Sequence, residues 1–261
     1  METTGNANPS PVVDEGREFI ETLMSSRSSR LTACQGWTVH EITAHLAAGS
    51  QEIADLIENH LAGGTPRDTR PFDDREAPYC AMEDRLLRPL LFEQVERAKR
   101  ARDRLAAHVD DAVPFTGRLM HAAEFVTHSR SERTLHRWDI VGRDEVGWEM
   151  LAQPELTVHA IKILTEMPVL AEAFENRLRV AKHPLGDFHV VLRSEPQDDV
   201  IVSRANGVLE VRTESVEDRR VDAYLEPAIR LLALWGRREP SAAIHLGRGA
   251  NHDALWGLFG W

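Results

Sequence analysis

The chain has 261 residues, 42% of them hydrophobic, which is enough for one large domain or two modest ones, and its formal net charge of −11 disfavours nucleic acid and anionic membrane surfaces as partners. Its two cysteines, Cys34 and Cys80, are far apart and form no CxxC pair, which excludes a zinc ribbon and a thioredoxin-like redox site. The N-terminus lacks the pattern of a signal peptide and no apolar run approaches the ~18 residues of a membrane span, so we expect a soluble, cytoplasmic protein.

The first two-thirds of the sequence has helical periodicity. Amphipathic helices are expected over residues 11–24, 38–56, 82–109 and 119–141. The second begins at GWTVHE, where Thr38 and Glu41 form a T-x-x-E capping box. Pro89 marks either the start of the third helix or a kink in it. Residues 63–78, GGTPRDTRPFDDREAP, are predicted to form a long polar connection, so four such helices indicate an antiparallel bundle with one long loop.

After about Leu185 the hydrophobic period changes to two. The segments DFHVVLRS, DVIVSR and GVLEVRT are predicted strands, and ANG is expected to form a hairpin turn between the last two. Helices are expected over residues 222–236, DAYLEPAIRLLALWG, and in the closing DALWGLFGW. The sequence therefore predicts an α+β protein, with a helical bundle domain over residues 1–170 and a small α+β domain over residues 171–261.

Two polar residues lie on the face of the fourth helix that should be buried. At about 100° per residue, one narrow sector contains Ala122, Phe125, Ser129, Glu132, His136 and Ile140. Because the sector has apolar residues at both ends, we expect it to face the core of the bundle. An ionised carboxylate there costs several kcal/mol unless it is paired or bound to a metal.

The second helix contains a third candidate ligand. His45, in ITAHLAAG, flanks the apolar stripe among small residues that leave room beside its imidazole. Two imidazoles and one carboxylate from two helices can converge on one ion, and catalytic zinc commonly takes three such ligands. The alternatives are a hydrogen-bonded structural histidine and a Glu-x-x-x-His pair on a helix surface. His128 lies at the edge of the sector and fits a structural role better. The remaining histidines are expected at the surface: His40, His60, His108, His121, His159 and those near the C-terminus.

Three motifs carry a resemblance to a known family. GWTVHEITAHLA, ERTLHRWDI and LLALWGR, in that order and spacing, resemble the mycothiol-dependent maleylpyruvate isomerase family, and the resemblance extends over nearly the whole chain. It implies a DinB-like four-helix bundle followed by a small α+β domain. It also implies a divalent metal, usually zinc, held by His45, Glu132 and His136, which are the residues that the helical-face argument isolates.

The resemblance further implies an enzyme that uses mycothiol as its thiol cosubstrate and a small electrophile as its other substrate. Coordination to a dication removes the proton of a thiol, and the thiolate attacks an electrophilic carbon. Reversible addition and elimination gives cis–trans isomerisation, whereas displacement of a leaving group gives S-transfer. A metal-dependent hydrolase on the same bundle and a noncatalytic, regulatory metal-binding module are the alternatives. The C-terminal domain favours the thiol-dependent enzyme, because a water nucleophile needs no second domain to hold it.

Two further residues are predicted to act at the site as catalytic groups. Asp139, three residues beyond His136, is expected to accept the free N–H of that imidazole, with a surface charge as the alternative. Arg237 follows Gly236, which is expected to end a helix in the left-handed conformation. That turn would direct Arg237 toward the bundle, where its planar fork can bind a carboxylate of the substrate or of the thiol cofactor. The alternative for Arg237 is an interaction with the negative end of the helix dipole.

Overall fold

The computed structural model describes residues 14–168, 172, 188–206, 208–215, 221–237 and 245–246. In this part of the chain the helices are α1 (Glu15–Ser25), α2 (Val39–Leu61), α3 (Phe72–Cys80), α4 (Asp84–Leu105), α5 (Ala122–Val141), α6 (Glu145–Leu151), α7 (Pro154–Glu166) and α9 (Pro227–Leu234). The strands are β1 (Val113–Phe115), β2 (Arg118–Met120), β3 (Phe188–Ser194), β4 (Gln197–Ala205), β5 (Val208–Glu214), β6 (Ala223–Tyr224) and β7 (His245–Leu246). The predicted α+β class is therefore confirmed.

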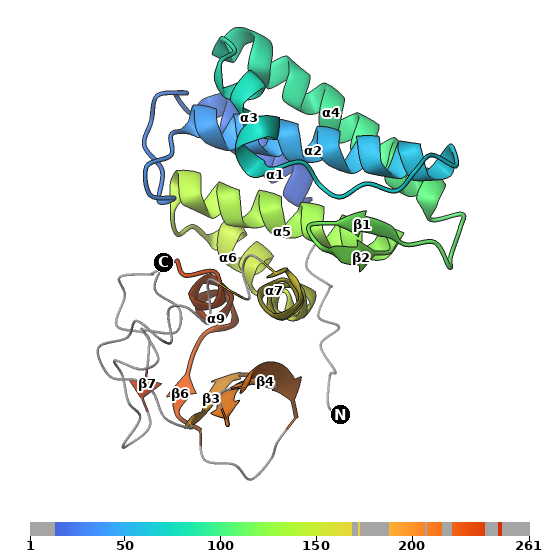
Figure 1. Ribbon diagram of the computed structural model, residues 1–261. Helices are drawn as coiled ribbons and strands as arrows, with labels where there is room; N and C mark the ends of the chain where they lie inside the picture. Colours follow the sequence, from blue (N-terminus) through green and yellow to red (C-terminus); the bar gives the residue numbers. More distant parts are fainter. Residues whose placement is uncertain are drawn as a thin grey trace, which may run out of the picture.

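Helices α1, α2, α4 and α5 are the four predicted helices and form one layer (Figure 1). Helix α2 packs along α4, and α1 packs along α5. The predicted capping box is present, because the Glu41 carboxylate accepts the Thr38 N–H at 2.8 Å and the Thr38 hydroxyl accepts the Glu41 N–H at 3.5 Å. Pro89 lies inside α4, so of the two alternatives predicted for it the start of the helix is wrong, and a kink stays a prediction.

The connection predicted over residues 63–78 contains helix α3, which corrects that prediction. Gly and Pro residues in the segment indicated a loop, but two other features favour a helix. Asp73 and Asp74 lie in the first turn, where negative charge interacts favourably with the helix dipole. Tyr79 is buried and donates its hydroxyl hydrogen to Gln51 of α2 at 2.6 Å. The packing of α3 on α2 is a tertiary contact that the local sequence does not reveal.

The segment between α2 and α3 is held by a buried carboxylate. Glu52 of α2 is 0% exposed, and its Oε1 accepts from Arg67 Nη1 at 2.5 Å and from the Arg70 N–H at 2.9 Å. Its Oε2 accepts from Arg70 Nε at 2.6 Å. Burial alone raises the pKa of Glu52, but these hydrogen bonds outweigh it and lower the pKa below the usual value.

We expect Glu52→Gln to lower the free energy of unfolding by about 1–3 kcal/mol, because the neutral amide cannot satisfy both arginines. The segment should also become more accessible, so trypsin should cleave after Arg67 and Arg70 faster than in the wild type. Urea unfolding and limited proteolysis measure the two effects. Glu58→Gln is the control, because its pair with Arg97 is partly exposed, unlike the fully buried Glu52 carboxylate, and should contribute less than about 1 kcal/mol. Equal losses in the two variants would contradict the anchoring role.

A short hairpin precedes α5. Strands β1 and β2 pair antiparallel, with Val113 opposite Met120. Leu119 lies in β2, so the prediction that the fourth helix begins there is wrong, and α5 begins at Ala122. Helices α6 and α7 follow α5 and are additional to the four predicted helices.

The larger sheet has the strand order β5-β4-β3-β6-β7. Its pairs are antiparallel except for the parallel pair of β3 and β6. Strands β3, β4 and β5 match the three predicted strands. The predicted hairpin is also confirmed, since Ala205 pairs with Val208 and Asn206 has a φ of +52°.

The helix predicted over residues 222–236 is only partly correct. Its first residues form β6, which pairs with β3, and α9 begins at Pro227, where proline suits the first helical position. The helix predicted in the closing DALWGLFGW lies outside the described residues. The predicted domain boundary near residue 170 also lies outside them, so the division of the chain into two domains stays a prediction.

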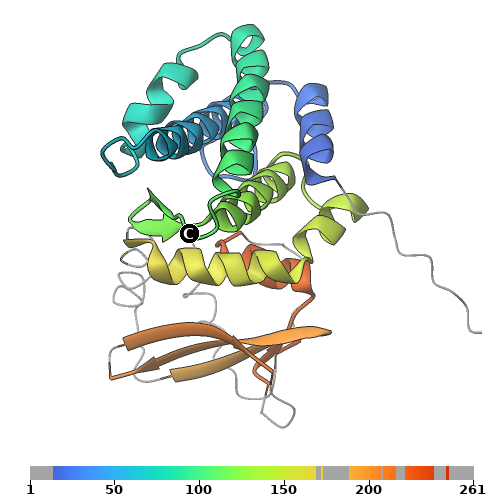
Figure 2. The ribbon, with the colours of Figure 1, turned by 90° about the vertical axis from the view of Figure 1, so that its right-hand side faces the viewer.

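Helices α7 and α9 lie between the bundle and the sheet (Figure 2). One hydrophobic cluster joins these layers, with Leu135 and Trp138 of α5, Leu231 of α9, and Val200 and Val202 of β4 among its members. Helix α5 is therefore buried on more than one side, which fixes the orientation of the side chains along it. No helix among the described residues is long and apolar enough to cross a membrane.

Candidate metal centre

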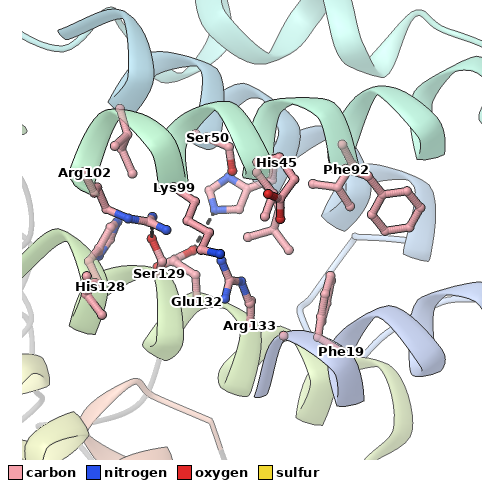
Figure 3. A pocket seen from close by; sticks show the side chains of 18 of the residues that line it. Phe19, His45, Ser50, Phe92, Lys99, Arg102, His128, Ser129, Glu132 and Arg133 are labelled. Atoms are coloured by element: carbon pink, nitrogen blue, oxygen red, sulfur yellow. Dashed lines mark hydrogen bonds and ion pairs between the residues drawn. The ribbon is translucent and has the colours of Figure 1, made fainter. Parts of the chain in front are cut away.

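His45 of α2 meets Glu132 and His136 of α5 inside the bundle. One potential ligand atom from each residue lies within 4.8 Å of those of the other two. Oε2 of Glu132 lies 3.1 Å from Nε2 of His45 and 3.5 Å from Nε2 of His136. Figure 3 shows His45 reaching from α2 to Glu132 on the facing helix. The structure thus brings together the three residues predicted as ligands, which we call the His–Glu–His cluster.

Each imidazole of the cluster is supported by a second carboxylate. Nδ1 of His45 lies 2.7 Å from Oε1 of Glu76, and Nδ1 of His136 lies 2.9 Å from Oδ2 of Asp139. Histidines that bind metal almost always donate their other ring N–H to such an acceptor, which fixes the tautomer and the ring orientation. Sequence reasoning missed Glu76, because this residue lies in the helix that was expected to be a loop.

The electrostatics favour the charged forms of His45 and Glu132. Burial alone lowers the pKa of His45, but its hydrogen bonds to Glu132 and Glu76 outweigh burial and raise the pKa to about 9. Burial alone raises the pKa of Glu132, but the bonds to His136 and His45 hold it well below the usual value. Two imidazole nitrogens and one carboxylate oxygen are donors that zinc takes at catalytic sites. The residues present therefore fit a divalent ion of this class.

Aromatic rings cover one side of the cluster. The Trp37 ring lies 6.1 Å from the His136 ring, with 15° between their planes, and 5.2 Å from the His45 ring. The Phe72 ring lies 5.6 Å from His45. Such rings exclude water, and charge interactions are stronger where water is excluded. Trp37 belongs to the GWTVHE motif, whereas Phe72 lies in the unpredicted helix α3.

Arg237 reaches the cluster through Asp139. Gly236 has a φ of +69°, its N–H bonds to the Ala233 carbonyl at 2.9 Å, and the Arg237 N–H bonds to the Leu232 carbonyl at 2.8 Å. These two bonds form a Schellman motif, which confirms the predicted left-handed glycine at the end of the helix. The turn directs Arg237 to Asp139, whose two oxygens accept from its Nε and Nη2, each at 2.8 Å.

The structure shows that the guanidinium of Arg237 already has a partner within the protein. Its fork binds Asp139 of the same chain, and Asp139 also contacts His136. The prediction that Arg237 binds a carboxylate of a ligand stays a prediction. Contacts from Arg237 to Asp139 and from Asp139 to His136 therefore link the end of α9 to a candidate metal ligand on α5.

A cavity of about 790 Å³ adjoins the cluster among α1, α2, α4 and α5. His45 and Glu132 line it, together with Phe19 and Phe92 (Figure 3). Its cationic lining residues are Arg17, Arg75, Lys99, Arg102 and Arg133. Cavities of this size commonly bind small organic molecules.

His128 and His159 form a second histidine pair beside this cavity. Nδ1 of His128 lies 3.3 Å from Nε2 of His159, and His159 is buried. The expectation that His159 lies at the surface is wrong, because α7 packs against α5. Burial is the main cause that lowers both pKa values, that of His159 to about 3, so both rings are neutral at pH 7. Such a neutral, buried pair fits the structural role expected for His128.

The fold and the cluster define a DinB-like helical bundle with a candidate metal centre, joined to a small α+β unit. A family model described as "Mycothiol maleylpyruvate isomerase N-terminal domain" matches residues 10–141, just over half of the chain. The chain belongs to the mycothiol-dependent maleylpyruvate isomerase family.

Two solved structures resemble the chain. One is a crystal structure of a mutant of the mycothiol-dependent maleylpyruvate isomerase, with 18% sequence identity and a TM-score of 0.56, covering 88% of this chain and 87% of that one. The other is a crystal structure of the enzyme named without a mutation, with 17% identity, a TM-score of 0.55 and the same coverage. At these identities the likeness shows the shared fold. No curated protein matches the chain.

Proposed function

We propose that the protein is a metal-dependent enzyme that activates a small thiol, mycothiol, for attack on a small electrophile. The reaction is isomerisation of the maleylpyruvate isomerase type or S-transfer. The observation that carries the proposal is the His–Glu–His cluster at the wall of a 790 Å³ cavity, in a chain of this family. A cytoplasmic location, which the mycothiol dependence of the family favours, is part of the same proposal.

Each residue of the site has a role that follows from its contacts. A divalent ion at the cluster would supply positive charge that favours the thiolate form of a thiol, whose ordinary pKa is about 8.5. His45, Glu132 and His136 would hold this ion, and Glu76 and Asp139 orient the two imidazoles toward it. The aromatic cover keeps bulk water away from that side of the reacting groups.

The reactive thiol comes from outside the chain, because neither cysteine is activated. Cys34 is half-buried, and burial, followed by the nearby Asp139 carboxylate, raises its pKa. Burial and the nearby Glu76 raise the pKa of Cys80. A cysteine with a raised pKa has little thiolate at neutral pH and is a poor nucleophile. A thiol cosubstrate in the cavity supplies what the chain lacks.

We expect turnover of maleylpyruvate to require mycothiol and a divalent metal. Metal-loaded protein is incubated with maleylpyruvate alone, with mycothiol, and with glutathione as a thiol of different shape. Thermal shift measures thiol binding, and product analysis separates the trans isomer from a thioether. His45→Ala is the control, since it should lose the activity while its bundle remains folded. Full turnover without any thiol would contradict the proposal and favour the hydrolase.

A further inference from the structure

Arg102 of α4 is a buried cation with few partners. Its exposed fraction is 7%, and it lines the cavity beside the His–Glu–His cluster. Its Nη1 donates to Ser129 Oγ at 2.5 Å, whereas its Nε has no hydrogen-bond partner. Among the residues that the structure describes, no carboxylate forms an ion pair with it. The guanidinium thus keeps both charge and donors available on the cavity side.

Other buried arginines of the molecule make more hydrogen bonds than Arg102, although Nε of Arg137 and Nε of Arg230 also lack a partner. Arg137 pairs with both oxygens of Asp144, each at 2.7 Å. Arg230 donates to the Asp198 carbonyl at 2.6 Å and to Gln197 Oε1 at 2.7 Å. Arg102 has only a hydroxyl. A buried cation without an anion costs stability unless other acceptors take its donors, and within the described part of the chain Arg102 has one such acceptor where Arg230 has more.

A second cation increases the positive charge of the same wall. Arg133 of α5 lines the cavity and forms no ion pair within the described ranges. Burial, followed by repulsion from Arg133, lowers the pKa of Arg102 to about 10. Glu96 and Asp103 also line the cavity and attract Arg102, but both are exposed to solvent, which screens their charge. The wall near Arg102 therefore favours an incoming anion.

The distance from this wall to the cluster suits a short molecule. Ser129 precedes Glu132 by three residues on α5, so their Cβ atoms are about 5–6 Å apart on one face of the helix. Figure 3 shows the Arg102–Ser129 and His45–Glu132 contacts next to each other along this helix. A molecule only a few carbons long can have its reacting carbon at the cluster and its end group at Arg102.

We propose that Arg102, assisted by Arg133, binds a carboxylate of the electrophilic substrate at a subsite one helical turn from the His–Glu–His cluster. The planar fork of Arg102 suits the two oxygens of a carboxylate. The assignment of this carboxylate to the substrate rests on the proposed function.

The experiment measures binding of maleate, with the neutral maleic diamide as control ligand, by calorimetry on metal-loaded protein. We expect Arg102→Met to weaken maleate binding by at least about tenfold and to leave diamide binding unchanged. Arg102→Lys should recover only part of the affinity. Arg104→Met is the matched control, because Arg104 is on the same helix but exposed, and should bind maleate within about twofold of the wild type.

Thermal unfolding separates a ligand role from a structural one. Without maleate, Arg102→Met should melt at the wild-type temperature or above it, since the variant removes an unpaired buried charge. Maleate should raise the melting temperature of the wild type much more than that of the variant. Wild-type affinity in Arg102→Met, or no binding of millimolar maleate to the wild type, would overturn the proposal. So would a lower melting temperature of Arg102→Met with unchanged binding.

The effect of Arg102→Met on maleate binding does not depend on the thiol chemistry, because this binding is measured without thiol. Turnover that needs no thiol, combined with maleate binding that depends on Arg102, would reject the proposed function and keep the anion site. Thiol-dependent turnover, combined with maleate binding that is insensitive to Arg102, would reject the subsite alone.

Discussion

Replacing His45 and His136 together by alanine is expected to reduce the bound divalent metal from about one ion per chain to background. Both rings direct Nε2 to the same Glu132 oxygen, and both are supported by carboxylates on their other side. The double variant leaves Glu132 as the sole remaining member, and one carboxylate cannot hold the ion at micromolar concentrations. Elemental analysis of protein purified without added metal measures the loss.

Graded variants test whether the whole arrangement acts as one site. Glu76→Ala should weaken metal affinity by about 10–100-fold, because the His45 ring loses the acceptor that orients it. His60→Ala is the control, since His60 pairs with Asp111 at 2.9 Å and does not belong to the cluster. Circular dichroism should show that all variants keep their helices. Metal content that stays the same in the double variant would refute the assignment.

Asp139→Ala is expected to lower the free energy of unfolding by about 3–5 kcal/mol. The Asp139 side chain is 0% exposed and that of Arg237 is 17% exposed, so the variant leaves a nearly buried guanidinium without its bidentate partner. The pair also joins α5 to the end of α9. Urea unfolding measures the loss, and Glu210→Ala, which breaks the exposed pair with Arg212, should change stability by less than about 1 kcal/mol.

Arg237→Lys should separate this structural role from binding of a ligand. Lysine keeps the charge but can satisfy only one Asp139 oxygen, so we expect both stability and the orientation of His136 to suffer. A role confined to ligand binding would instead leave stability unchanged and lower activity alone. The coupling energy from a double-mutant cycle with Asp139→Ala measures the pair directly.

The pH dependence of stability should carry the signature of Asp139. Burial alone raises its pKa, but hydrogen bonds from Arg237 and His136 lower it from 3.8 to about 2. The ionised form is therefore favoured in the folded state, and its contribution of about 2 kcal/mol is present above about pH 4 and lost as the pH falls toward 2. Asp139→Asn should lack this loss in that window. If the free energy of unfolding of Asp139→Asn fell between about pH 4 and pH 2 as steeply as that of the wild type, the assigned pairing would be contradicted.

The sequence by itself determined the features that depend on backbone geometry over a few residues. The period of the α-helix placed Glu132 and His136 on one face, and the same reasoning isolated His45 beside a buried stripe. The capping box, the left-handed Gly236 and the two-residue hairpin turn are also local, because their hydrogen bonds join residues close in the chain. Local geometry is fixed by the chain itself and can be read from its pattern.

Only the tertiary structure decided which distant residues meet. Arg237 and Asp139 are 98 positions apart, so nothing in either motif shows that one binds the other. Glu76 supports His45 only because α3 forms through packing on α2, against the Gly and Pro residues of its segment. Arg102 likewise lacks a carboxylate partner among the described residues because of how α4 packs, and its sequence neighbours do not show this. Such contacts depend on how helices pack against one another, and local periodicity does not specify that packing.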